Sequence, residues 1–138
     1  MGLWSFLFGK SVKRNLTEDY FECERFFKPS GEQIGLTVTG GLGSLTQQQE
    51  SFVAQLENNY QLIVDAIIPI VEDEFRNWKP DFRIVDFKRE FKPVYLNIPT
   101  CDQQPVEWEI AFETVHDRNH TFTAGMLDGE PQYVRVDG

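Results

Sequence analysis

The sequence contains little cysteine. Cys23 and Cys101 are the two thiols among 138 residues, and so few cysteines in a chain of this size do not predict a disulfide framework. We interpret both as reduced thiols of a cytoplasmic protein. Neither lies in a catalytic sequence context, and the charge of Asp102 is expected to raise the thiol pKa of Cys101. A disulfide-rich secreted module and a thiol enzyme are therefore disfavoured.

Basic residues are also scarce. The chain has 13 lysines and arginines against 22 aspartates and glutamates, a formal net charge of −9. This charge repels the phosphates that dominate affinity for DNA and RNA, so no nucleic acid partner is expected. Residues 44–78 hold six of the carboxylates and one basic side chain. Such an acidic stretch is either a solvated helix face or a contact region for a basic protein.

The N-terminal stretch MGLWSFLFGK has a short apolar run. It is far shorter than the roughly 20 residues that a membrane span needs. It also lacks the leading positive charge and the cleavage site of a signal peptide. We expect this segment, within residues 1–15, to be a loosely attached part of the domain that docks on it. The alternative is contact with a membrane surface or a partner through Leu3, Trp4, Phe6, Leu7 and Phe8.

What the chain does have is enough apolar material for a core. Hydrophobic residues make up 41% of the sequence and aromatic residues 14%, which predicts a folded single domain over residues 1–138. The clearest element is a long helix, with Ser44 and Gln47 at the spacing of a capping box. Pro69 removes one backbone donor and predicts a kink or two helices in series near Ile68. The apolar residues that share one helical face are Phe52, Val53, Leu56, Tyr60, Ile63, Val64, Ile67, Val71, Phe75 and Trp78.

Strands are predicted on both sides of this helix. Alternating apolar and β-branched residues between turn residues place them at 20–27, 33–39, 82–87, 94–98, 106–113, 120–126 and 133–136. The order of elements argues for an α+β fold. We expect a mostly antiparallel sheet of about five to seven strands, packed on one long helix that is interrupted at Pro69.

Both histidines lie in the stretch WEIAFETVHDRNHTF, among several carboxylates. Apolar residues alternate in this stretch and predict a strand, so the histidines fall in or beside a hairpin turn. We expect solvated or cross-strand histidines. The alternative function is a small metal-dependent hydrolase or a ligand-binding domain. Its metal ligands would be His116, Asp117 and His120, although the H-D-R-N-H spacing forms a metal pair readily on a helix and not in a turn.

Other patterns that occur in enzymes have simpler explanations. The loop TGGLGS lacks the lysine of a P-loop and the spacing of a dinucleotide-binding loop, so it is interpreted as a glycine turn before a helix cap. Glu107 with Glu109, and Asp86 with Glu90, resemble general acid–base pairs. Among 22 acidic residues such pairs arise by chance, and we assign them to solvent. We expect no cofactor.

The remaining functional evidence in the sequence is the charge and the apolar character of residues expected at the surface. Glu72, Asp73 and Glu74 crowd the end of the predicted helix, where carboxylates are electrostatically unfavourable. Aromatic anchors and complementary charge are how protein interfaces gain affinity and association rate. We therefore predict that these three residues form the contact region for another protein.

Three stretches together resemble a known group of proteins: MGLWSFLFGK, the helix LTQQQESFVAQLENNYQLIV, and the ending WEIAFE with HTFTAGMLDGEPQYVRVDG. They are similar to small uncharacterised bacterial α+β proteins, some of which are associated with toxin–immunity systems. The resemblance implies a cytoplasmic bacterial protein and carries no catalytic residues. For an immunity protein it implies a role in blocking one toxin. Our prediction is a non-enzymatic interaction protein, an immunity-type inhibitor of a basic toxin.

Overall fold

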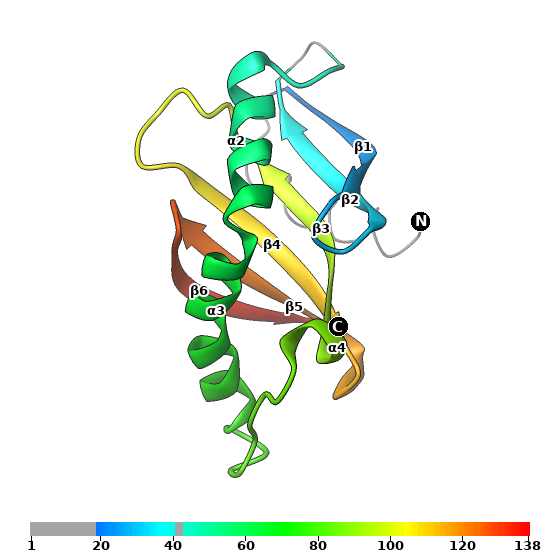
Figure 1. Ribbon diagram of the computed structural model, residues 1–138, viewed down its shortest axis with the longest axis vertical. Helices are drawn as coiled ribbons and strands as arrows, with labels where there is room; N and C mark the ends of the chain where they lie inside the picture. The colour runs from blue at the N-terminus through cyan, green and yellow to red at the C-terminus, as the bar shows by residue number, and fades with distance from the viewer. Residues whose placement is uncertain (1–18, 41–42) are drawn as a thin grey trace.

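In the part of the chain that the structure describes, two helices form a layer on one face of a six-stranded sheet (Figure 1). The computed structural model describes residues 19–40 and 43–138. An α+β fold with a mostly antiparallel sheet is confirmed. Leu3, Trp4, Phe6, Leu7 and Phe8, on which the predictions for the N-terminus rest, lie outside the described residues. The elements are β1 (Tyr20–Phe27), β2 (Glu32–Thr39), α2 (Gln47–Asn58), α3 (Tyr60–Phe75), α4 (Phe87–Glu90), β3 (Phe91–Ile98), β4 (Glu107–Thr114), β5 (Asp117–Leu127) and β6 (Glu130–Asp137).

The strands follow one another across the sheet in sequence order, β1 to β6. Four of the five neighbouring pairs are antiparallel, and β2 with β3 is the parallel pair. The two helices form the crossover between these parallel strands. A parallel pair needs such a crossover because its second strand must start at the same end of the sheet as the first.

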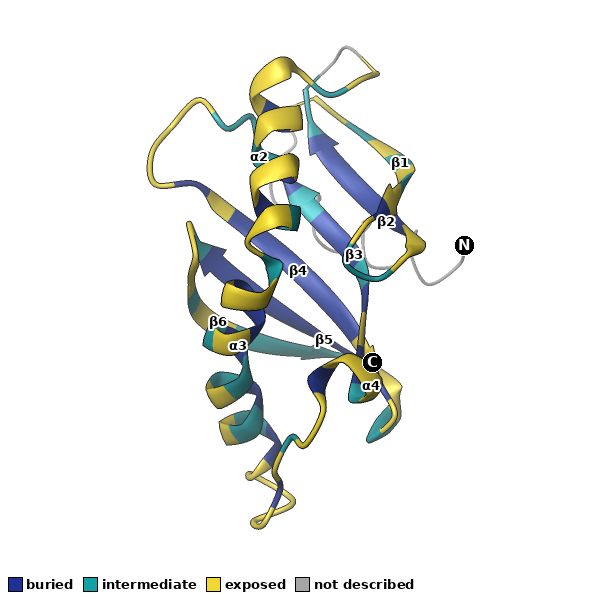
Figure 2. Cartoon of the chain, in the orientation of Figure 1, coloured by how far each residue is buried: buried dark blue, intermediate teal, exposed yellow. Residues whose placement is uncertain are grey.

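The sheet has two different faces because side chains alternate along each strand. The face toward the helices carries buried apolar residues from β2 to β5, and α2 and α3 pack on it to form the core (Figure 2). The opposite face carries the residues in between: Thr37 on β2, Tyr95 on β3, Ala111 on β4 and Thr123 on β5. These are buried as well.

The helical layer differs from the prediction of one helix interrupted at Pro69. Asn59, with φ −104° and ψ 15°, separates α2 from α3, so the break lies well before the proline. Asparagine is a weak helix former because its side chain competes for backbone hydrogen bonds. Pro69 lies inside α3 on an exposed position. Water can therefore bind the carbonyl of Asp65, which lacks its helical donor, and the helix continues.

The helix start also differs from the prediction. The N-cap is Thr46 and not Ser44, and it forms a capping box with Gln49. The amide nitrogen of the buried Gln49 side chain donates to the carbonyls of Thr39 and Pro99, at 2.8 and 2.9 Å. These hydrogen bonds tie the first turn of α2 to the ends of β2 and β3. A cap at Thr46 places Gln49 at the third helical position, where its side chain reaches the sheet. The predicted cap at Ser44 would have placed Gln47 at that position instead.

The predicted strand over residues 82–87 is wrong. Phe82 and Phe87 are buried, but they are five residues apart and could not share one face of a strand, and the chain is irregular up to the one-turn helix α4. The backbone N–H groups of Ile84, Val85 and Asp86 donate to glutamate side chains. Because these donors have partners, the segment needs no neighbouring strand.

In the described part of the chain, no helix is long and apolar enough to cross a membrane.

Candidate functional site

Residues 76–90, which we call the pinned loop, connect α3 to β3 and are irregular apart from α4. Two buried phenylalanines anchor the loop in the core. Phe82 stacks on Phe75 with ring centroids 4.3 Å apart, and Phe87 stacks on Phe91 at 4.9 Å. Long irregular connections in compact domains are usually functional or disordered. Because two buried phenylalanines anchor the pinned loop, it belongs to the ordered connections and not to the disordered ones.

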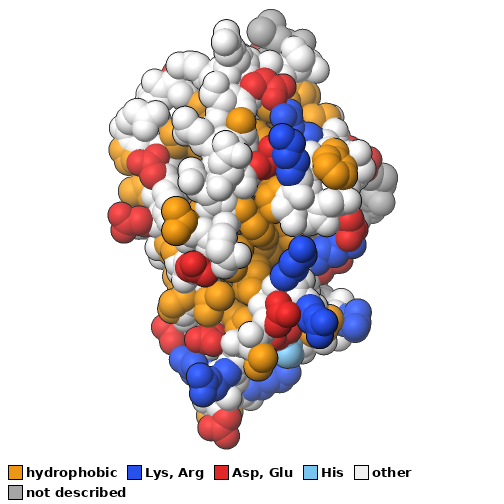
Figure 3. Space-filling view, in the orientation of Figure 1, with side chains coloured by type: hydrophobic (Ala, Val, Ile, Leu, Met, Phe, Trp, Pro, Cys, Tyr) orange, Lys and Arg blue, Asp and Glu red, His pale blue; other side chains and the backbone are white. Residues whose placement is uncertain are grey.

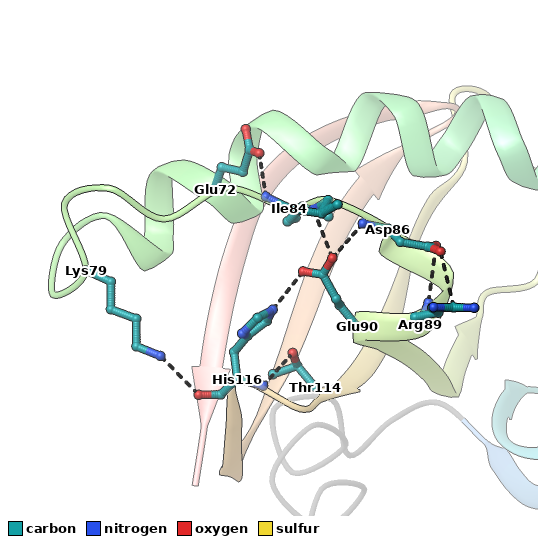
Figure 4. Close-up of polar contacts among 9 residues, drawn as sticks. Glu72, Lys79, Ile84, Asp86, Arg89, Glu90, Thr114 and His116 are labelled. Carbon is teal, nitrogen blue, oxygen red and sulfur yellow. Dashed lines mark hydrogen bonds and ion pairs between the residues drawn. The ribbon is translucent and has the colours of Figure 1, made fainter.

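Two glutamates hold the backbone of the pinned loop (Figure 4). The N–H of Ile84 donates to Glu72 Oε2 at 2.9 Å. The N–H groups of Val85 and Asp86 both donate to Glu90 Oε2, at 2.9 and 2.6 Å. Three consecutive backbone donors are therefore satisfied by carboxylates, and hydrogen bonds to charged acceptors are stronger than neutral ones.

The second oxygen of Glu90 joins the loop to the hairpin between β4 and β5. His116 Nε2 lies 2.7 Å from Glu90 Oε1. The imidazole meets Phe82 edge-on at 4.9 Å between centroids, and Phe75 and Phe91 lie around it. The Glu90 side chain is 14% exposed. The loop and the hairpin are thus connected through a partly buried polar pair.

The surroundings of Glu90 favour its charged form. Burial by itself raises the pKa of this carboxyl, but hydrogen bonds from the N–H of Asp86, from His116 and from the N–H of Val85 outweigh burial. The pKa of Glu90 is therefore lower than that of an ordinary glutamate. A carboxylate that accepts several hydrogen bonds is stabilised in this way.

The outer side of the pinned loop is apolar at several positions. Val85 is 91% exposed, although its own N–H is held by Glu90. Trp78 is exposed, and Val115 is exposed on the neighbouring hairpin. Figure 3 shows acidic and basic side chains close together at this lower end of the molecule. The arrangement presents apolar side chains to solvent on a fixed backbone, which suits binding to a protein surface.

The predicted contact residues lie at the start of this site. Glu72 is turned inward, with its side chain 17% exposed, and lies 3.5 Å from Arg76 Nη2. Asp73 is 77% exposed and 3.3 Å from Arg76 Nη1. Glu74 is partly exposed. Glu72 therefore serves the loop itself, whereas Asp73 and Glu74 stay available as a predicted contact region.

The structure does not bring His116, Asp117 and His120 together as one metal-ligand set. His116 binds Glu90, whereas His120 Nδ1 lies 2.7 Å from Asp117 Oδ2. Within residues 19–40 and 43–138, no three histidine, cysteine, aspartate or glutamate side chains are arranged to hold a metal. The hairpin explains this result. His116 precedes β5 and turns toward the loop, and His120 lies within the strand.

Sequence reasoning missed two carboxylates that are shielded from solvent, the partly buried Glu90 and the buried Glu109. The assignment of Glu90 to solvent is wrong, because this side chain holds the pinned loop from inside. The assignment of Glu109 to solvent is also wrong, since Glu109 is buried on the sheet. One signal for Glu90 is present in the sequence: Asp86 caps α4, and Glu90 follows within its first turn. An aspartate cap followed by glutamate marks a helix start and not a strand.

Both cysteines are free thiols. Burial and the charge of Asp102 raise the pKa of the Cys101 thiol to about 11. The predicted effect of Asp102 is thereby confirmed. A thiol with this pKa has little thiolate at neutral pH and is a poor nucleophile.

Comparison of the chain with protein-family models, with curated proteins and with solved structures gives no match. The resemblance to toxin–immunity proteins stays a prediction. The features of the molecule that bear on function are the geometry of the pinned loop and the charge around it.

Proposed function

We propose that this chain is a non-enzymatic binding protein that contacts another protein through the pinned loop. The carrying observation is Val85, whose side chain is 91% exposed while its N–H is held by Glu90 at 2.9 Å. An apolar side chain in water adds nothing to folding, and its burial against a partner is favourable. Because the loop backbone is already held in place, binding does not have to order it.

The charge of the helical layer beside the pinned loop supports a basic partner, whereas the loop itself, with five lysines and arginines and three carboxylates in residues 76–90, contributes its apolar side chains and not its charge. Residues 47–75 contain six carboxylates and no lysine or arginine. Asp73 and Glu74 belong to this set and flank the pinned loop. Complementary charge accelerates association and disfavours acidic competitors. An immunity-type inhibitor that blocks a basic toxin in the cytoplasm is the role that fits these features best.

The test removes the apolar side chain from the loop without changing the backbone. The full chain, a Val85→Ser variant and a Leu62→Ser control are immobilised, and extracts of the source organism are passed over each. Leu62 is the matched control because it is an exposed aliphatic residue, at 69%, on α3 and away from the loop. We expect one basic protein to bind the unmodified chain and the control, with affinity for Val85→Ser reduced at least about tenfold.

Two results would count against the proposal. A partner that binds Val85→Ser as tightly as the unmodified chain would remove the pinned loop from the interface. A partner that is lost on Leu62→Ser would instead place the contact in the groove of about 810 Å³ beside α2, which Leu62 lines. Dissociation constants measured by surface plasmon resonance on the retained protein separate these cases.

A further inference from the structure

Four residues form a row across the end of the sheet that lies away from the pinned loop. Asn97, next to the last residue of β3, pairs with Glu109 on β4. Gly125 on β5 lies between Glu109 and Tyr133 of β6 and pairs with both. The neighbouring Trp108 packs against a phenylalanine of α2. Because side chains alternate along a strand, the row lies on the face opposite the helices.

A glycine in the middle of this row makes room for an aromatic ring. A Cβ atom at Gly125 would stand 2.1 Å from the Tyr133 ring, so the ring occupies space that any other residue would fill. The Tyr133 hydroxyl donates to Glu109 Oε2 at 2.7 Å, and Arg135 Nη1 donates to the same oxygen at 3.0 Å. Two donors therefore hold one oxygen of the Glu109 carboxylate in a fixed position.

The other oxygen of Glu109 has no such donor. The side chain is 8% exposed, and its buried Oε1 has no hydrogen-bond partner in the described part of the chain. A buried acceptor without a donor costs free energy, and the cost is larger for a charged group than for a neutral one. Such atoms are rare in folded proteins, and a bound water or ligand is a common explanation for them.

A cavity of about 380 Å³ lies beside this carboxylate. The described residues that line it include Asn97, Glu107, Glu109, Gln132 and Tyr133. The cavity is open to solvent, because Glu107 and Gln132 are exposed and Tyr133 is 45% exposed. Ligand sites in proteins have volumes of roughly 300–1,000 Å³, so this cavity suits a small molecule.

The charge around the cavity is negative. Arg135 Nε also donates to Asp137 Oδ2 at 2.9 Å, so one guanidinium is shared by two carboxylates. Glu107 brings another carboxylate to the cavity, and none of its described lining residues is a lysine, an arginine or a histidine. A cation that carries N–H groups would supply both the missing donor and the missing positive charge.

The spacing of the two lining carboxylates indicates the kind of cation. In the described part of the chain, no three histidine, cysteine, aspartate or glutamate side chains are arranged to hold a metal, which favours an organic cation. Glu107 and Glu109 are two residues apart on the same face of β4, a distance of about 7 Å along the strand. A short chain of methylenes with an ammonium group at each end spans this distance.

We propose that this cavity is a binding site for a small aliphatic diamine. One ammonium group donates to Glu109 Oε1 and to the side-chain oxygen of Asn97. The methylenes lie along the Tyr133 ring, and the second ammonium group pairs with the exposed Glu107. The site lies at the opposite end of the sheet from the pinned loop, so it is independent of the proposed contact with another protein.

Nuclear magnetic resonance titration of the full, isotopically labelled chain with 1,4-diaminobutane tests this proposal. We expect saturable shifts of the amide signals of Asn97, Gly125 and Tyr133. The dissociation constant should be below about 1 mM, an affinity that a ligand of about six non-hydrogen atoms can reach. 1,4-Butanediol, which has the same length but no charge, should cause no saturable shifts. Butylamine should bind about two- to fivefold more weakly than the diamine, because it lacks the exposed ion pair with Glu107.

Two variants separate the roles of the carboxylates. Glu109→Gln keeps the size of the side chain but removes its buried charge, and the affinity for 1,4-diaminobutane should fall at least about tenfold. Glu107→Gln changes an exposed residue outside the hydrogen-bond network of Glu109. It should weaken binding of the diamine about two- to fivefold and leave that of butylamine unchanged. Glu113→Gln, at an exposed position on the same strand, is the control and should bind both amines like the unmodified chain.

Three outcomes would overturn the proposal. The first is the absence of saturable shifts up to about 10 mM diamine, which would leave a bound water as the donor to Glu109 Oε1. The second is equal binding of 1,4-butanediol, which would show that charge plays no part. The third is a set of shifts spread over the acidic helices and unchanged in Glu107→Gln, which would show general attraction of cations to a chain of net charge −9. These measurements decide even if Glu109→Gln does not fold.

Discussion

Glu90 connects more parts of the site than any other side chain. Its carboxylate accepts hydrogen bonds from two backbone N–H groups and also binds the imidazole of His116. Its pKa is lowered in the folded protein, so its charged form stabilises the fold. This contribution is fully present above the unfolded-state pKa of about 4.3 and is lost as the pH falls through the lower folded-state value. The pinned loop should consequently loosen in acid before the rest of the chain.

The prediction for this residue is a Glu90→Gln variant with a weaker pH dependence. At pH 7 the free energy of unfolding should fall by about 1–3 kcal/mol, because a neutral amide accepts the Val85 and Asp86 N–H groups less well. Between pH 5 and 3 the variant should lose less stability than the unmodified chain. Urea unfolding at several pH values measures both effects. Glu113→Gln, at an exposed position, is the control, and equal pH slopes in all three proteins would contradict the assigned role.

At the scale of the element, α3 shows how a helix tolerates proline. Pro69 lies on the exposed side, where the carbonyl that lacks its helical donor is accessible to water. A Pro69→Ala variant should restore the N–H to the carbonyl of Asp65 and raise the free energy of unfolding by about 1–3 kcal/mol, since proline is about 3 kcal/mol less favourable than alanine inside a helix. Thermal unfolding followed by circular dichroism measures the change. A lower melting temperature would mean that the helix bends at Pro69 to fit the sheet.

The elements also show what a pattern in the sequence can predict. Periodicity located the helical region and most of the strands, because those elements bury one face and repeat with their own period. It failed at residues 82–87, where Phe82 and Ile84 alternate with polar or exposed residues as in a strand but the backbone donors are taken by Glu72 and Glu90. Those acceptors come from α3 and from beyond the segment itself. A local pattern contains no information about partners that tertiary structure supplies.

The same distinction applies to the candidate site. Clustered charge in the sequence pointed to Glu72, Asp73 and Glu74, and two of these, Asp73 and Glu74, lie beside the pinned loop with their side chains at least partly exposed. The exposure of Val85 was not predictable, because a valine in an alternating apolar stretch is normally buried. Glu109 was missed for the opposite reason. A glutamate between two apolar residues of a strand is normally exposed, and here Glu109 is buried, with Tyr133 and Arg135 bound to its carboxylate.

At the scale of the whole molecule, the charge distribution predicts how a partner approaches. Replacing Asp73 and Glu74 by lysine changes the local charge by four units. We expect the association rate with the captured basic partner to fall about tenfold at low salt, and by much less at 0.5 M salt, where the Debye length is only a few ångströms. Stopped-flow or surface plasmon resonance kinetics check this. Gln47→Lys with Gln48→Lys, at exposed positions on α2, is the control for charge at a distance from the loop.

The parallel pairing of β2 with β3 has a consequence for the order of events on the ribosome. The hairpin of β1 and β2 is synthesised first, but its inner edge has no strand beside it until β3 is complete at Ile98. Between them lie both helices and the pinned loop. The four strands from β3 to β6 follow one another along the chain and pair with their neighbours in sequence, and such local contacts form fast. We therefore expect β3 to β6 to assemble first as one unit. The hairpin of β1 and β2, whose inner edge is still unpaired, then pairs with β3.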